Sequence, residues 1–251
     1  LFPDITYSFY PVYCKLYEID FKTIPLNDSF EIALNDYLIP NGGIIFPNPN
    51  APTGRSIGRS EIERLLNKNK DSVLVIDEAY VDYGTESCIQ LLRGTNCPEN
   101  LLVVHTLSKS RALAGLRVGF AVGHPTLIEG LERVKNSFNS YPLGRLAQAG
   151  AIAAIEDQEH LEETSAKVIQ TRTKLIEQLN ALGFDTLPST ANFIFTRHPK
   201  HAGSKLYQAL RDRGIIVRHF KSPRIEEFLR ITIGTDEQSG ELVAALKEIL
   251  A

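Results

Sequence analysis

Lys109 is the residue in this sequence whose neighbours best suit covalent chemistry. It follows an apolar run over residues 101–104, the hydroxyls of Thr106 and Ser108 precede it, and Arg117 comes eight residues after it. A lysine that forms a Schiff base with a carbonyl group needs a rigid strand end to hold it, while hydroxyls and a guanidinium bind a phosphate. The segment therefore predicts amine chemistry on a phosphorylated carbonyl compound, although an isolated lysine is most often a solvated surface charge.

A carboxylate ends another apolar run. Residues 73–76 have the pattern of a buried strand, Asp77 follows directly, and Tyr80 comes three residues later. The carboxyl ends of strands in an open α/β sheet face the ligand crevice, so Asp77 is placed to pair with a protonated ring nitrogen. Taken alone, Asp77 also suits the N-cap of a helix, and that alternative stays open at this point.

Two further segments could complete a ligand site. Prolines and a glycine rigidify the turn at residues 47–54 (P-N-P-N-A-P-T-G), and its asparagines can donate to a ring oxygen. Tyr7 lies in an aromatic segment over residues 6–10 and can stack on a planar ring. Taken singly, the turn is more often an ordinary loop, and Tyr7 is more often a core or surface aromatic residue.

The elements around these residues predict an α/β fold. Short continuous apolar strands separated by helices are typical of a mainly parallel sheet with both faces covered. The strands expected in the first half are residues 43–46, 73–76, 101–104 and 118–122. The tail is expected to hold strands at residues 193–195, 215–217 and 229–233 and helices at residues 202–213 and 237–250. We expect a large domain over residues 1–150 and a smaller α+β domain, with its connecting helix, over residues 151–251.

Two helical patterns have recognisable ends. Residues 60–68 predict a helix with Ser60 as its N-cap and Glu63 completing a capping box. The long helical pattern over residues 145–182 is closed by Gly183. Two helices broken near Asp157 agree with this pattern as well as one long helix does.

Composition argues against several classes of protein. With 43% hydrophobic and 23% charged residues in a chain of 251, the sequence suits a soluble globular enzyme, and a net charge of −3 gives no reason to expect nucleic-acid binding. No apolar run reaches membrane-spanning length and the N-terminus has no secretory pattern, so we expect a cytoplasmic protein without a membrane partner. Cys14, Cys88 and Cys97 lack C-x-x-C spacing, which favours reduced thiols over a disulfide or a metal site. The chain begins at Leu1 and contains no methionine, so we expect an incomplete or processed product.

Jointly, these motifs resemble the fold-type I, pyridoxal-phosphate-dependent aminotransferases of classes I and II. The resemblance rests on T-L-S-K at Lys109, D-E-A-Y at Asp77, the N-P-N-A-P-T-G turn and Arg117. Within that family, the sequence is most similar to the histidinol-phosphate aminotransferases, from about residue 6 to about residue 234. The resemblance implies a cofactor-binding large domain, a smaller C-terminal domain, and pyridoxal 5'-phosphate as the cofactor.

The resemblance also implies a role for each residue matched to the cofactor site. Lys109 forms the Schiff base with the cofactor and, once freed, moves a proton on the substrate. Asp77 pairs with the pyridinium nitrogen, Tyr80 bonds the phenolic oxygen of the ring, and Tyr7 stacks on the ring. The residues matched to the cofactor phosphate are Thr106, Ser108 and Arg117.

Three residues of the tail match the substrate side of the family. The resemblance implies that Arg230 clamps the substrate carboxylate or its equivalent, that Arg218 contacts a substrate phosphate, and that Asn192 lies near the substrate. The implied reaction transfers an amino group from histidinol phosphate to 2-oxoglutarate, in histidine biosynthesis, by a ping-pong mechanism. An aromatic aminotransferase, a decarboxylase of a phosphorylated amino acid, and a non-catalytic binding protein of the same fold remain alternatives.

The sequence departs from the family pattern at two places. Ala51 stands where the family has an asparagine that reaches the ring oxygen. Either Asn50 or Asn48 replaces it through a shifted loop, or Tyr80 bonds the ring oxygen alone; of these we favour Asn50. The family's glycine-rich phosphate turn precedes the Tyr7 segment and is not among these residues, so we expect this chain to bind the cofactor poorly. Because the family's active sites lie at a subunit interface, the resemblance implies a homodimer that binds a small-molecule amino donor and a 2-oxo acid.

Overall fold

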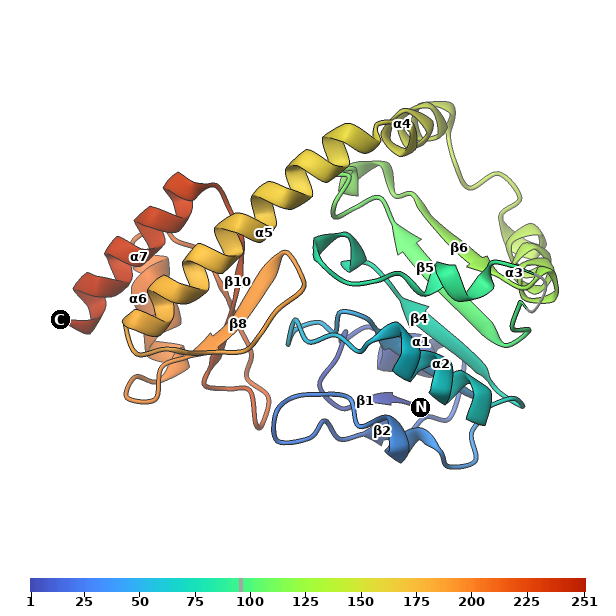
Figure 1. The fold of residues 1–251 in the computed structure, drawn as a ribbon, viewed down its shortest axis with the longest axis horizontal. Coiled ribbons are helices and arrows are strands. Elements are labelled where there is room, and N and C mark those ends of the chain that lie inside the picture. The colour runs from blue at the N-terminus through green and yellow to red at the C-terminus, as the bar shows by residue number, and fades with distance from the viewer. Residues whose placement is uncertain (95–96) are drawn as a thin grey trace.

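The apolar runs of the first half form one sheet with the order β3-β4-β5-β6 (Figure 1). The computed structural model describes residues 1–94 and 97–251. Its strands are Gly43–Pro47 (β3), Val73–Asp77 (β4), Leu101–Thr106 (β5) and Gly119–Gly123 (β6). The first three are parallel and β6 is antiparallel to β5, so the predicted mainly parallel sheet is confirmed. Parallel neighbours bring their carboxyl ends to one edge, where Asp77 and the end of β5 lie side by side.

Helix α2 (Arg59–Lys68) contributes to the core at this sheet. It buries Ile62, Leu65 and Leu66, whose i, i+3, i+4 spacing forms one apolar stripe. These side chains belong to the same cluster as the buried residues of β3, β4 and β5. The remaining elements on this side of the molecule are β1 (Phe2–Pro3), α1 (Tyr10–Leu16), β2 (Thr23–Ile24) and α3 (Pro125–Phe138).

Two helices join this sheet to the second half of the chain. Helix α4 (Arg145–Glu156) ends at Asp157, whose side chain accepts a hydrogen bond from the His160 amide at 3.1 Å and caps helix α5 (Gln158–Ala181). Of the two arrangements left open by the sequence, the structure has two helices broken at Asp157. Gly183 follows α5 with a φ of +87°, a conformation that favours glycine. Figure 1 shows α5 running from beside β6 to the second sheet.

The C-terminal part packs helices on a second, antiparallel sheet. The strand order is β7-β8-β10-β9. The strands are Asp185–Thr186 (β7), Phe193–Arg197 (β8), Arg218–His219 (β9) and Phe228–Thr232 (β10), and the helices are Gly203–Asp212 (α6) and Asp236–Leu250 (α7). Side chains of α5, α6 and α7 share one buried cluster with β8 and β10. The predicted boundary between residues 150 and 151 falls within α4 and stays a prediction.

Two local expectations were wrong. Helix α2 begins at Arg59 with Gly58 as its N-cap and no side-chain cap, so the capping box expected from Ser60 and Glu63 does not form. A strand was expected at residues 215–217. In the structure β9 pairs with β10 only at Arg218 and His219, so residues 215–217 come before the strand. A capping box does form at Thr235 and Gln238, where none was expected, and it starts α7.

Short 3-10 helices connect several of these elements. They span Leu34–Tyr37 (η1), Val81–Tyr83 (η2), Cys88–Leu92 (η3) and Ala114–Leu116 (η4). Cys14, Cys88 and Cys97 are all free thiols. Across residues 1–94 and 97–251, no helix combines the length and the apolar character needed to cross a bilayer.

Candidate active site

A cavity of about 380 Å³ lies at the carboxyl ends of β4 and β5. Asp77 is the last residue of β4, and Lys109 lies three residues after the end of β5, so two parallel strands place them on the same cavity. The lining residues are Tyr7, Pro47, Ala51, Asp77, Ala79, Tyr80, Val104, His105, Thr106, Ser108, Lys109 and Arg117. Seven of the eleven residues singled out from the sequence therefore share one cavity, although they come from four separate segments of the chain.

Asp77 is held in place by two donors. The Tyr10 hydroxyl donates to Oδ2 at 2.9 Å, and the Ala79 amide donates to Oδ1 at 3.1 Å. Burial raises the pKa of the Asp77 carboxyl above its usual range, while these two hydrogen bonds and the nearby His105 and Lys109 oppose that rise. A carboxylate that is short of solvent gains most from a cationic ligand group, which suits a protonated ring nitrogen.

The loop that carries Lys109 is anchored by backbone hydrogen bonds. The Leu107 amide donates to the Val118 carbonyl at 3.0 Å, and the Leu113 amide donates to the Leu107 carbonyl at 2.9 Å. Leu107 is buried, whereas Lys109 itself is exposed to the open cavity. The Lys109 ammonium lies over the Tyr80 ring, 5.3 Å from its centroid. The backbone is therefore rigid at the base of a lysine whose amine stays accessible to a ligand.

Hydroxyls and a guanidinium gather at one part of the cavity. Thr106 Oγ1 accepts a hydrogen bond from the Ser108 amide at 3.1 Å, which fixes the turn after β5. Arg117 has a left-handed backbone with a φ of +57°, and its Nη1 donates to the Ala114 carbonyl at 3.0 Å. Within the described residues, Arg117 forms no ion pair with a carboxylate. Its charge is available to an anionic ligand group such as a phosphate.

Two aromatic residues flank the cavity. Tyr7 is 48% exposed and its ring meets Tyr10 edge-on, with 5.5 Å between centroids. Partial burial raises the pKa of the Tyr7 hydroxyl above its usual range. The Tyr80 ring is perpendicular to the Phe193 ring, with 5.0 Å between their centroids, and so contacts the second half of the chain.

Asn50 does not line the cavity, contrary to its expected contact with a ring oxygen. Its Nδ2 donates to the Ile5 carbonyl at 3.0 Å and to Thr53 Oγ1 at 3.1 Å, and its Oδ1 accepts from Thr6 Oγ1 at 2.9 Å. These bonds use the side chain within a buried turn, since Asn50 is 1% exposed. Ala51 occupies the cavity wall instead, and its methyl group cannot donate a hydrogen bond.

The three residues predicted for the substrate side lie beside the cavity and are not among its lining residues. The Arg230 guanidinium lies over the Phe193 ring, 5.2 Å from its centroid, and its buried Nε has no hydrogen-bond partner in the described structure. Burial lowers the pKa of the Arg230 guanidinium, Arg218 adds to the fall, and Tyr80 opposes it. Arg218 is opposite Arg230 in the β9–β10 register and lies over Phe220. Asn192 directly precedes Phe193 and is partly buried.

Two residues that sequence reasoning missed belong to the site. Tyr10 holds Asp77, and it is the first residue of α1, three residues after Tyr7. His105 lines the cavity, and its Nε2 lies 2.7 Å from Oε2 of the buried Glu78. No local pattern links residues 78 and 105, because their contact depends on the pairing of β4 with β5.

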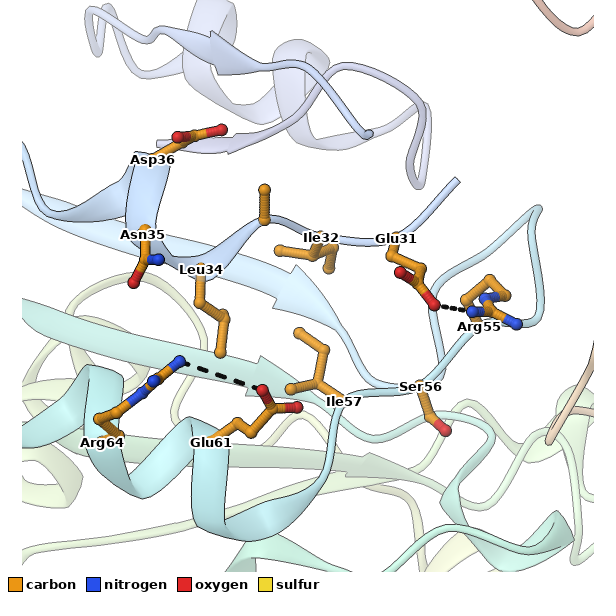
Figure 2. A pocket seen from close by; sticks show the side chains of 11 residues that line it. Glu31, Ile32, Leu34, Asn35, Asp36, Arg55, Ser56, Ile57, Glu61 and Arg64 are labelled. Carbon is orange, nitrogen blue, oxygen red and sulfur yellow. Dashed lines mark ion pairs between the residues drawn. The ribbon is translucent and has the colours of Figure 1, made fainter. Parts of the chain in front are cut away.

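A second cavity lies next to the segment that follows the turn at residues 47–54 (Figure 2). It is lined by residues 31–36, by residues 55–57 that follow the N-P-N-A-P-T-G turn, and by two side chains of α2. Its charged groups pair with one another, Arg55 with Glu31 and Arg64 with Glu61. None of the residues singled out from the sequence lines it, so it is not the candidate site.

Comparison with known proteins identifies the family. Residues 1–246 match the model of the family described as aminotransferase class I and II. The chain belongs to the class I and II aminotransferases. It is 60% identical, over 251 residues, to histidinol-phosphate aminotransferase 1 of Methylococcus capsulatus, covering 100% of this chain and 70% of that protein. It is 63% identical, over 253 residues, to the histidinol-phosphate aminotransferase of Aromatoleum aromaticum, covering 99% of this chain and 70% of that protein.

A solved structure confirms the fold. The histidinol-phosphate aminotransferase of Sinorhizobium meliloti, in complex with pyridoxal-5'-phosphate, superposes with a TM-score of 0.89. The superposition covers 99% of this chain and 69% of the Sinorhizobium meliloti chain, and the two sequences are 24% identical. The fold-type I architecture expected from the resemblance is therefore confirmed.

Proposed function

We propose that this chain carries the cofactor and substrate site of a pyridoxal-phosphate-dependent transaminase that acts on histidinol phosphate and 2-oxoglutarate, in histidine biosynthesis. The observation that carries the proposal is the placement of Lys109 and Asp77 on one cavity at the ends of neighbouring parallel strands. The identity of 60% to 63% with curated histidinol-phosphate aminotransferases supports the choice of substrate.

The residues of the cavity fit the chemical groups of pyridoxal phosphate. The buried Asp77 carboxylate, whose pKa burial raises, is suited to the ring nitrogen. Arg117, with Thr106 and Ser108, is suited to the phosphate, and the face of Tyr7 is suited to the ring. Tyr80 is left to bond the phenolic oxygen, because Asn50 is turned away and Ala51 has no donor.

When bound, the cofactor supplies an electron sink that makes a substrate C–H bond acidic. Asp77 keeps the ring nitrogen protonated, which is what lets the ring accept electron density. The Lys109 amine reaches into the same cavity and carries the proton between the two carbon atoms that exchange it. Its position over Tyr80 lets the phenolic ring stabilise the ammonium form between those two events.

Arg230 and Arg218 suit a site that must accept two kinds of anion. Histidinol phosphate carries a phosphate and no α-carboxylate, whereas 2-oxoglutarate carries two carboxylates. Two neighbouring arginines from paired strands can bind either group, because a guanidinium donates bidentately to carboxylates and phosphates alike. The unpaired Nε of Arg230 supports a role in ligand binding. A ping-pong mechanism follows if both substrates use this one site in turn.

We further propose a homodimer and a cytoplasmic location. Supporting the dimer, three aromatic side chains in and just before α1 are between 42% and 48% exposed: Tyr7, Phe9 and Tyr13. An exposed aromatic cluster of this kind marks an interaction surface, and a second copy placed there would adjoin the site. The three free cysteines suit a reducing compartment.

Spectroscopy and half-reactions test the function. Because we expect weak cofactor binding, pyridoxal phosphate is added in large excess. It should produce a visible absorbance band that Lys109→Ala abolishes and that substitution of an exposed lysine of α6, Lys205→Ala, retains. Histidinol phosphate should convert the bound cofactor to its amine form, and 2-oxoglutarate should restore it. Conversion by phenylalanine alone would favour an aromatic aminotransferase, and loss of carbon dioxide from O-phosphothreonine would favour a decarboxylase. Absence of a Lys109-dependent band would refute the proposal.

A further inference from the structure

Arg172 is a buried cation that the proposed chemistry does not use. It lies on α5, is 7% exposed, and forms no ion pair within the described residues. Burial lowers the pKa of its guanidinium, as expected for a charge without a carboxylate partner. Burying a charge is costly unless its donors are satisfied, so the contacts that Arg172 makes indicate what it does.

One nitrogen of Arg172 joins the two halves of the chain. Its Nη1 donates to the Tyr83 carbonyl at 2.9 Å and to the Ala191 carbonyl at 2.7 Å. Tyr83 ends the short helix that begins one residue after Tyr80, on the cofactor side. Ala191 directly precedes Asn192, on the substrate side. The same guanidinium therefore bridges the two walls that the proposed function requires to act on one ligand.

Further contacts connect the same two segments. The Thr85 hydroxyl donates to Thr190 Oγ1 at 2.9 Å, and the Thr190 amide donates to the Gly54 carbonyl at 3.0 Å. The Tyr83 hydroxyl lies against the Asn192 side chain, and burial raises its pKa to about 12. Residues 80–85 and 189–193 thus form a junction, and in the described structure the Arg172 guanidinium donates to both of its segments.

The junction also leads to the substrate arginine. Phe193 follows Asn192, and its ring lies under the Arg230 guanidinium, 5.2 Å from the ring centroid. The Phe193 and Tyr80 rings are perpendicular, with 5.0 Å between their centroids. A displacement of residues 191–193 would therefore move Asn192 and the support of Arg230 together. Asp77 would not move with them, since its partners are Tyr10 and Ala79.

We propose that Arg172 is a positioning residue that sets the substrate-binding wall, Asn192 and Arg230, against the cofactor-binding wall. This inference rests on the proposed function, because it assigns the two walls to substrate and cofactor. Its signature is a selective change: substrate binding weakens while cofactor binding is retained. A residue that only stabilised the fold would not separate these two properties.

The test compares three variants with the wild-type protein. Arg172→Met keeps an unbranched apolar stem and removes the donors, Arg172→Lys keeps a charge and a donor, and Leu175→Ala is the control. Leu175 lies on the same helix and is 1% exposed in the C-terminal core, so its truncation lowers stability without touching the junction. For each protein we would measure KM and kcat for histidinol phosphate, the dissociation constant of pyridoxal phosphate by absorbance, and the unfolding midpoint.

We expect Arg172→Met to raise KM about tenfold or more, while the cofactor dissociation constant and kcat change by less than about threefold. Arg172→Lys should recover part of the loss, and Leu175→Ala should lower the unfolding midpoint with KM unchanged. An unchanged KM in Arg172→Met, or an equal rise of KM in Leu175→Ala, would overturn the inference. If Arg172→Met does not fold, Thr85→Val is measured instead, because it removes the hydrogen bond to Thr190 in the same junction. A raised KM with unchanged cofactor binding would support the inference, and an unchanged KM would overturn it. A wild-type protein that fails the half-reaction would refute the proposed function and not this inference, which would then be tested with the donor that does react.

Discussion

Removing the Tyr10 hydroxyl should make cofactor binding more sensitive to acid. Tyr10→Phe deletes the 2.9 Å bond to Asp77 Oδ2 and leaves the Ala79 amide as the remaining donor to that carboxylate. The ring stays buried, since Tyr10 is 5% exposed and packs against Phe2 and Tyr7. The variant therefore changes the electrostatics of Asp77 with little change in packing.

The size of the effect follows from the bond that is lost. A hydrogen bond to a charged group contributes about 1.5–3 kcal/mol, or roughly ten- to a hundredfold in an equilibrium constant. The pKa of Asp77 is already raised by burial, and the Tyr10 hydroxyl is the strongest of the groups that hold it down. Without that hydroxyl, Asp77 becomes protonated at higher pH, and a protonated carboxyl cannot accept a hydrogen bond from a pyridinium in the same way.

The assay is the dissociation constant of pyridoxal phosphate, measured for both proteins across the pH range. The cofactor's own titrations cancel in the ratio of the two constants. We expect this ratio to lie within about threefold of one at alkaline pH and to rise towards roughly ten- to a hundredfold as the pH falls. Tyr13→Phe, the same chemical change in the same helix without a bond to Asp77, should give a flat ratio. A flat ratio for Tyr10→Phe would refute the reasoning.

Three further substitutions test other parts of the structure. Gly54→Ala should destabilise the protein by about 1–3 kcal/mol in urea unfolding, because its φ is +75° and a Cβ would lie 2.5 Å from Ser189 Oγ; an unchanged midpoint would contradict this placement of the turn. Thr235→Ala should cost about 1 kcal/mol by removing the cap bond to the Gln238 amide, and a loss that Thr235→Ser does not restore would argue against the cap. Asp77→Asn should raise the melting temperature of the cofactor-free protein at pH 7. Because the pKa of the Asp77 carboxyl is raised, the folded protein binds its proton more readily than the unfolded chain does. Ionisation of Asp77 therefore lowers the stability of the folded protein as the pH rises through that pKa. That gain should fade on acidification, and a gain that grows towards low pH would show that the pKa of Asp77 is lowered.

The parts of the site that sequence reasoning predicted are those that depend on one strand and the residues just after it. Asp77 and Lys109 follow continuous apolar runs, and the rule that parallel strands present their carboxyl ends together was enough to bring them to one cavity. The same runs predicted the mainly parallel type of the large sheet but not its strand order, which only the structure gives. Their signal is strong because a strand buried on both faces tolerates few polar residues.

Contacts that join distant segments were beyond the sequence. The bond from Tyr10 to Asp77 spans 67 residues, and the bond from Arg172 to Tyr83 spans 89. Arg172 also lies in a helical pattern that gives a charged residue no reason to be buried. Its burial depends on how α5 crosses from one sheet to the other, which periodicity along one helix does not specify.

Asn50 shows how local similarity and geometry can lead to different residues. The turn offers two asparagines, and the one next to Ala51 was the natural substitute for a missing donor. In the structure, that asparagine is committed to the Ile5 carbonyl and to the hydroxyls of Thr6 and Thr53, so moving it into the cavity would leave buried polar groups unpaired. The turn is therefore held by the very side chain that was expected to bind the ligand. In the proposed site, Tyr80 is the donor left for the ring oxygen. Because its ring also meets Phe193, the proposed cofactor and substrate sides share one aromatic contact.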